Sequence, residues 1–127
     1  HARFRRHLFY LQMTLAEFEK ETAAAIRALP VFFRERLENV AVLVRARPSA
    51  AQVKRFGRGL LGLYEGVPHL DRGQSYSGAM PDKITLFKIN IEAAGGDIKR
   101  EIRNVLMHEI AHHFGMDDEE LLRKGLY

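Results

Sequence analysis

The stretch from residue 97 to residue 115 constrains the fold more than any other part of this 127-residue chain. Gly95 and Gly96 break the preceding structure, and Asp97 is a residue type that commonly caps the start of a helix. Apolar residues then recur at helical spacing as far as Gly115, which suits the left-handed position just past a helix end. We therefore expect one long helix between Asp97 and Gly115, against which the rest of the chain packs.

This helix carries the segment His108-Glu-Ile-Ala-His112. Residues four apart on an α-helix differ by about 40° around the axis and about 6 Å along it. Two imidazoles at that spacing can bind one tetrahedral Zn²⁺, with Glu109 about 100° further round and near enough to reach a water at the metal. The alternative is a pair of surface histidines on a charged helix. We favour the zinc site, and Zn²⁺ is the cofactor that we expect.

Three short apolar segments predict strands. Residues 40–44 are rich in valine and lie between Asn39 and Pro48, which is typical of a buried strand. Residues 60–64 and 83–88 predict the other two.

The N-terminal half predicts two further helices. Thr14 and Glu17 form a capping-box signature, which is followed by about four turns of helical apolar spacing. Pro30 ends this helix and can open a shorter one over residues 31–38. Residues 49–59 are polar and basic, and we expect a loop or a short helical turn there.

Together these elements predict an α+β fold, a small mixed sheet with the long zinc-binding helix packed across it. The length suits one compact domain, and no repeat or linker divides the chain, so we expect a single domain over residues 1–127.

Composition excludes several classes of function. The chain has no cysteine, which rules out disulfides, thiolate metal sites and cysteine nucleophiles. No apolar run approaches the ~20 residues that span a bilayer, and no signal peptide is visible, so the cytoplasm is the default expectation. The net charge is +4, but the cations are scattered among acidic residues, so we expect a solvated surface and not a nucleic-acid site. We expect a monomer.

The sequence also resembles a known family. HEIAHHFGMDDEEL is similar to the zinc segment of the small bacterial zincin-like metallopeptidases, once a domain of unknown function. ALPVFFRERLENVAVLV, LLGLYEGVPH and MPDKITLFKINIE resemble that family's other recurring blocks in the same order, so the resemblance covers about residues 15–122. It implies a minimal zincin fold, with His108 and His112 as zinc ligands and Glu109 as the general base.

The longer pattern HExxHxxGxxD is similar to that of metzincins, in which a glycine turns the chain so that a third ligand returns to the metal. This resemblance implies that Gly115 is the glycine and Asp118 the third ligand. The chain departs from metzincins because only nine residues follow Asp118, and Met116 lies inside the loop instead of in a downstream turn.

The third ligand has a structural alternative. The run Asp117-Asp118-Glu119-Glu120 opens a last predicted helix over residues 118–124, and a helix start of this kind needs a cap. Asp117 suits the cap, with Glu120 three residues later, which leaves Asp118 for the metal. The choice between Asp117 and Asp118 stays open. His113 lies about 100° from His112 and should point off the metal.

Tyr64 and His69 are the candidate substrate contacts. They flank a turn that contains glycine and proline, and both could donate to a developing oxyanion. Strand packing for Tyr64 and a loop role for His69 are the alternatives that we favour. We expect the pair Phe32-Phe33 to lie in the core.

These features predict a zinc-dependent peptidase that hydrolyses a peptide or protein. Glu109 would take a proton from water and return it to the leaving amine. We expect the substrate to lie extended along residues 83–88, taken as a sheet edge. One alternative is a zinc-binding but catalytically weak protein- or peptide-binding module, favoured by the missing downstream turn. The other is a nucleic-acid-binding protein, favoured only by a pI near 9.6.

Overall fold

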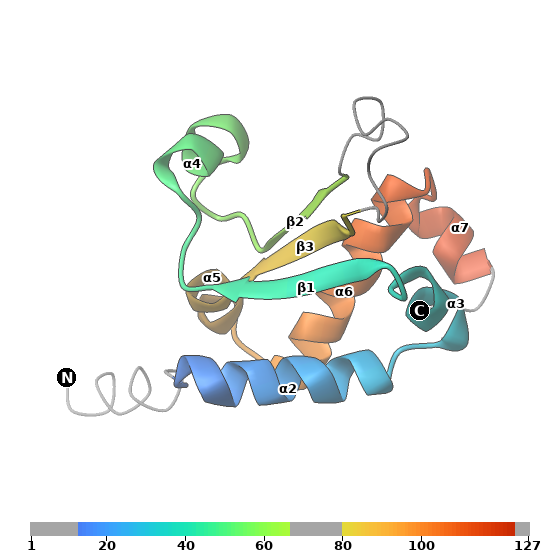
Figure 1. Ribbon diagram of the computed structural model, residues 1–127, viewed down its shortest axis with the longest axis horizontal. Coiled ribbons are helices and arrows are strands. Elements are labelled where there is room, and N and C mark those ends of the chain that lie inside the picture. Colours follow the sequence, from blue (N-terminus) through green and yellow to red (C-terminus); the bar gives the residue numbers. More distant parts are fainter. Residues whose placement is uncertain (1–12, 67–79, 124–127) are drawn as a thin grey trace.

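A computed structural model of the chain describes residues 13–66 and 80–123. In chain order its elements are α2 (Leu15–Arg27), α3 (Val31–Arg36), β1 (Val40–Arg45), α4 (Ala50–Phe56), β2 (Gly62–Glu65), β3 (Asp82–Phe87), α5 (Lys88–Ala93), α6 (Ile98–His113) and α7 (Asp118–Arg123). The predicted α+β fold is confirmed: a small mixed sheet is crossed by the long helix α6 (Figure 1).

The sheet has the strand order β1-β3-β2, with β3 parallel to β1 and antiparallel to β2. The expectation that residues 83–88 form the substrate-binding edge is therefore wrong, because β3 is paired on both sides. Its side chains from Ile84 to Phe87 are all buried, which is what a central strand requires. The prediction of a buried strand at residues 40–44 also needs correction, because β1 lies at an edge and is only half-buried.

The two faces of the sheet differ in character. Ile84 and Leu86 of β3 are fully buried in the core, on the face that α6 covers at Gly62. On the opposite face, Glu65 and Lys83 stand side by side with their charged atoms 3.7 Å apart. Strand side chains alternate between faces, so the core packs on the face of Ile84 and Leu86, whereas the face of Lys83 is polar at its Glu65–Lys83 end and buried at Thr85 and Phe87.

Helix α6 supplies the centre of the core. Ile102, Leu106 and Ile110 recur at helical spacing and are fully buried. They belong to the same core as Phe18 and Ala25 of α2, the helix whose predicted Thr14–Glu17 capping box is present. The side chain of Asp97 accepts from Lys99 N at 3.2 Å, so the predicted cap of α6 is confirmed as well.

Two helices differ from the sequence-based expectation. Residues 50–56 form the helix α4, which is longer than the short helical turn expected as the alternative to a loop, and Ser49 and Gln52 make a reciprocal capping box at its start. The helix α5 was not predicted at all. The adjacent phenylalanines, both expected in the core, differ in burial. Phe33 is fully buried, whereas Phe32 is half-buried, with the Arg36 guanidinium 3.5 Å from its ring centre.

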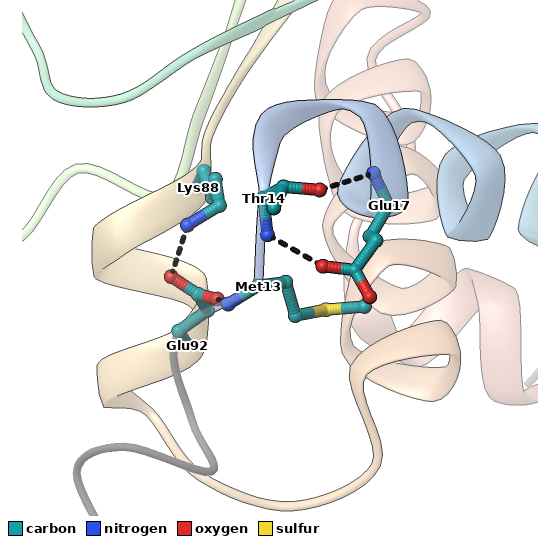
Figure 2. A network of polar contacts seen from close by, with 5 residues as sticks. All are labelled: Met13, Thr14, Glu17, Lys88 and Glu92. Atoms are coloured by element: carbon teal, nitrogen blue, oxygen red, sulfur yellow. Dashed lines mark hydrogen bonds and ion pairs between the residues drawn. The ribbon is translucent and has the colours of Figure 1, made fainter.

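A buried ion pair ties α5 to the start of α2 (Figure 2). Lys88 Nζ donates to Glu92 Oε1 at 2.9 Å, and the two side chains are 10% and 5% exposed. The other oxygen of Glu92 accepts from Met13 N at 2.8 Å, next to the Thr14 cap. We call Met13, Lys88 and Glu92 the polar clamp.

Candidate functional site

The chain reverses sharply at the end of α6. Gly115 has φ of 73°, a left-handed conformation that glycine adopts without strain. Its N–H donates to His112 O at 3.1 Å, and Met116 N donates to Ala111 O at 2.7 Å. These two bonds form a Schellman motif, as expected for a helix that ends at a glycine. The turn allows α7 to begin at residue 118, close behind the two histidines in sequence.

Asp117 caps α7. Its Oδ1 accepts from Glu120 N at 2.8 Å, which is the bond expected of an N-cap. Asp118 is the first residue of the helix, but its side chain lies outside the described residues. The capping role predicted for Asp117 is thus confirmed, and the role of Asp118 stays a prediction.

His108 and His112 lie one turn apart on the same face of α6, with ring centroids 6.3 Å apart. His108 is half-buried, and its Nδ1 lies 2.8 Å from the carbonyl oxygen of Asn104. A carbonyl can only accept, so Nδ1 carries the proton and Nε2 is the nitrogen with a lone pair. A metal-binding histidine commonly orients its ring through such a bond. The pair therefore fits zinc in donor type, and His108 fits it in ring orientation as well.

Among the side chains that the structure describes, no three histidine, aspartate or glutamate residues are grouped to hold one metal ion. His108 and His112 supply two ligands, and catalytic zinc sites usually have three from the protein. The next carboxylates along the chain follow the turn at Gly115, so one of them is the candidate for the third ligand.

Glu109 lies against the backbone of β2. Leu61 O accepts from Phe87 N at 3.0 Å. In an antiparallel ladder the backbone N–H and C=O groups of alternate residues point toward the partner strand, and those of the residues between them point away from it. Tyr64, three residues further on, therefore directs its N–H away from β3, and that N–H donates to Glu109 Oε1 at 3.0 Å. Burial raises the pKa of the Glu109 carboxyl, and the Tyr64 N–H, His112 and His108 partly offset this rise.

Gly62 allows helix and strand to come this close. A Cβ at this position would lie 2.6 Å from Val105 Cγ1 and 3.6 Å from Glu109 Cγ. Any larger residue would push α6 away from β2, and Glu109 with it. Glycine in a strand interior often marks such a close approach.

Tyr64 and His113 stack on each other, with ring centroids 3.9 Å apart and planes 15° apart. Tyr64 Oη donates to Asp82 Oδ2 at 2.9 Å, and His113 Nε2 lies 3.9 Å from that same oxygen. Burial, together with the hydrogen bond and the charge of Asp82, raises the pKa of Tyr64 to about 12. The Tyr64 hydroxyl is thus held by Asp82, which favours packing over an oxyanion role. The other candidate, His69, lies outside the described residues.

A pocket of about 590 Å³ opens beside His108 and Glu109. It lies between α6, the end of α4 and the start of β2. Its lining residues are Phe56, Gly59, Leu60, Leu61, Gly62, Glu101, Asn104, Val105, His108 and Glu109. His108 and Glu109 therefore stand at the side of a cavity large enough for a substrate side chain.

Several residues of this arrangement were missed from the sequence. Gly62 carried a signal, as a glycine inside an apolar strand segment. Asn104 contacts His108 through its backbone carbonyl, which any residue at that position would supply, so its side chain carried no signal. The sequence carried no signal for Asp82 or Phe56, because their neighbours come from elements far away in the chain.

Comparison with known proteins gives a family. The zincin-like metallopeptidase family matches residues 37–126, from the end of α3 through β1, the two other strands, α6 and α7. No curated protein sequence gives a significant match. Within the part of the chain that the structure describes, no helix is long and apolar enough to cross a membrane. The match spans well over half of the chain and contains the histidine pair with its glutamate, so the protein belongs to the zincin-like metallopeptidase family.

Proposed function

We propose that the chain is a zinc-dependent peptidase in which His108 and His112 hold the metal, Asp118 completes the ligand set and Glu109 is the general base. The observation that carries the proposal is the placement of Glu109. Its carboxylate is fixed on the Tyr64 N–H, one residue from a zinc-type histidine and beside an open pocket.

Each residue contributes a separate part of the chemistry. A zinc ion held by the histidines would polarise the scissile carbonyl and make water a better nucleophile. Glu109 accepts the proton from that water and delivers it to the leaving amine. The Tyr64 N–H keeps the Glu109 carboxylate in place, and Asn104 O keeps the His108 ring turned so that Nε2 can bind. A carboxyl group whose pKa burial has raised is a stronger base once it is ionised.

The substrate would lie along β2, and not along β3 as the sequence indicated. In the described sheet β2 is an edge strand, and it is the strand against which Glu109 lies. Gly62 and Tyr64 direct their backbone groups away from β3, toward this edge. An extended peptide that pairs with Gly62 would place a peptide bond near Glu109, through backbone contacts that do not depend on its sequence.

The test is hydrolysis of a mixture of unstructured peptides by the zinc-loaded chain, followed by mass spectrometry. Glu109→Gln keeps an oxygen that can accept from Tyr64 N, but it cannot take a proton. We expect this variant to retain zinc and to lose at least about 100-fold in cleavage rate. Glu19→Gln, on the exposed surface of α2, is the matched control and should cleave normally. Unchanged cleavage by Glu109→Gln would show that Glu109 is not the base, whereas a zinc-loaded wild-type chain that binds peptides and cleaves none would favour the zinc-binding module without catalysis.

A further inference from the structure

We propose that the pocket beside α6 receives the side chain of a lysine or arginine residue that flanks the scissile bond, and that Glu101 selects it. This inference rests on the proposed peptidase function, because it treats the pocket as part of the same substrate site. It adds the class of substrate, which the family does not give.

The pocket runs along one face of α6. Glu101, Asn104 and His108 are separated by three and four residues, so they lie in a row on that face, and all three line the pocket. Glu101 is two helical turns, or about 10 Å, from His108. One end of the pocket is therefore at the proposed catalytic residues and the other end is at Glu101. A side chain next to the scissile bond would enter at the first end and extend toward the second.

The walls between these ends are mainly apolar. Phe56, Leu60, Leu61 and Val105 line them, together with two glycines that leave room. Phe56 is 43% exposed, so its ring is open to a side chain that enters the pocket. Apolar walls suit the methylene stem of lysine or arginine, which is commonly buried while its charged head reaches a polar partner.

The charge of the lining is opposite to that of the whole chain. The protein has 20 Lys and Arg against 16 Asp and Glu, yet the charged residues that line the pocket are the carboxylates Glu101 and Glu109 and no lysine or arginine. Arg55 and Arg58 do not belong to the lining, although the Arg55 guanidinium lies 5.1 Å from the ring centre of Phe56. A pocket of this character attracts a cation and disfavours an acidic side chain.

Glu101 is the carboxylate that is placed for the cationic head. Glu109 lies at the catalytic end and accepts from Tyr64 N. Glu101 is half-buried and lies near the helix start, where a Cβ on Gly96 would be 3.4 Å from its Oε1. Within residues 13–66 and 80–123, no lysine or arginine forms an ion pair with it. A leucine side chain would contact the apolar walls but would not reach this carboxylate.

The experiment measures peptide binding without catalysis. Zinc-loaded Glu109→Gln protein is titrated with two sets of fluorescent peptides that differ at one position. In the first set this position lies just before the central peptide bond, and in the second set it lies just after that bond. That position carries lysine, arginine, leucine, glutamate or norleucine, which keeps the four-carbon stem of lysine without its charge. From one of the two sides, we expect lysine and arginine to bind about tenfold more tightly than norleucine, by fluorescence anisotropy.

Substitutions at Glu101 then assign the preference. In the Glu109→Gln background, Glu101→Gln should bring the lysine and norleucine peptides to within about twofold of each other, and Glu101→Lys should favour the glutamate peptide. Glu19→Gln removes an equivalent exposed charge from α2 and should leave the preference intact. The inference is overturned if leucine or norleucine binds as tightly as lysine, if the preference survives Glu101→Gln, or if no peptide binds.

The two proposals fail separately. If the wild-type chain cleaves no peptide while Glu109→Gln binds lysine peptides through Glu101, the peptidase function is wrong and the pocket assignment stands. If the wild-type chain cleaves beside leucine in preference to lysine, the function stands and the pocket assignment is wrong.

Discussion

The polar clamp and the cluster around Glu109 are both built on a carboxylate that accepts a backbone N–H from a distant segment, yet they differ in what else the carboxylate meets. Glu92 meets the ammonium group of Lys88, and both side chains are almost fully buried. Glu109 meets the Tyr64 N–H and no lysine or arginine among the described residues, and it borders a pocket. The first carboxylate is neutralised and enclosed, whereas the second is desolvated without a partner of opposite charge.

This difference predicts which of the two carboxylates contributes to stability and which to activity. A buried carboxylate that has its cation and its hydrogen bonds holds two segments together, and removal of one partner is costly. A carboxylate that is partly desolvated, with no lysine or arginine beside it, has a raised pKa and is suited to accept a proton. We therefore expect substitutions in the clamp to change stability, and substitutions around Glu109 to change activity.

The largest expected effect is in the clamp. Glu92→Leu leaves the Lys88 ammonium buried without a partner, and should lower the free energy of unfolding by about 3–5 kcal/mol, measured by urea denaturation of metal-free protein. The double variant Lys88→Met with Glu92→Leu removes both charges and should recover most of that loss. Glu109→Gln should change stability by less than about 1 kcal/mol, because its amide oxygen can still accept from Tyr64 N. A loss at Glu92 no larger than that at Glu109 would break the comparison.

The next effect tests how closely α6 and β2 must approach. Gly62→Ala places a methyl group 2.6 Å from Val105 Cγ1, and should cost about 1–3 kcal/mol of stability and reduce cleavage by moving Glu109. Gly59→Ala is the matched control for stability alone, because a Cβ there has no atom within 4 Å, and it should leave the free energy of unfolding unchanged. Adding Val105→Ala to Gly62→Ala should restore part of both losses. Normal stability and activity in Gly62→Ala would show that the contact does not position the base.

Asp117 and Asp118 should show the same contrast between a structural and a functional carboxylate, with a smaller change in stability. Asp117→Ala removes the bond to Glu120 N and should cost about 1 kcal/mol, with zinc affinity unchanged. Asp118→Ala should weaken zinc binding by about 100-fold or more, measured by competition with a chelator, and should affect stability of the metal-free protein less. If the two variants exchange these outcomes, Asp117 is the ligand and the assignment of the turn is wrong.

The smallest expected effect is at the Tyr64 hydroxyl. Tyr64→Phe loses the bond to Asp82 and should cost about 1 kcal/mol at neutral pH. The pKa of Tyr64 is about 12 in the folded chain against an ordinary value of 10.0, so only the unfolded chain releases this proton in that interval. Wild-type stability should therefore fall more steeply than that of Tyr64→Phe between about pH 10 and pH 12. Parallel stability curves for the two proteins would mean that the hydroxyl is not held by Asp82.

The parts of the fold that were predicted correctly depend on local chemistry. The caps at Thr14 and Asp97 and the left-handed Gly115 are decided by residues within one turn of each other. The Ser49–Gln52 capping box was equally local, but the basic residues after it suggested a loop, and so α4 was underestimated. The helix α5 was missed because Lys88 and Glu92 look like surface residues until their ion pair is seen to be buried.

The order of the strands could not be predicted in the same way. The apolar segments identified β1, β2 and β3, but their pairing depends on contacts between residues about 20 to 40 positions apart. For this reason the sequence predicts β3 as the substrate edge, although the strand is central. In the site, the sequence identified His108, His112 and Glu109 by their spacing. It could not show that the Tyr64 N–H faces Glu109, because a strand's hydrogen-bonding direction follows from its register.

The central claim is that His108 and His112, but not their neighbour His113, bind zinc. The direct measurement is the zinc content of purified, chelator-washed and reloaded protein, by atomic emission, in the wild type and in His108→Ala, His112→Ala and His113→Ala. We expect about one zinc per chain in the wild type and in His113→Ala, whose ring stacks on Tyr64, and less than a tenth of that in the other two. Zinc retained at wild-type stoichiometry in His108→Ala, or lost only in His113→Ala, would contradict the account.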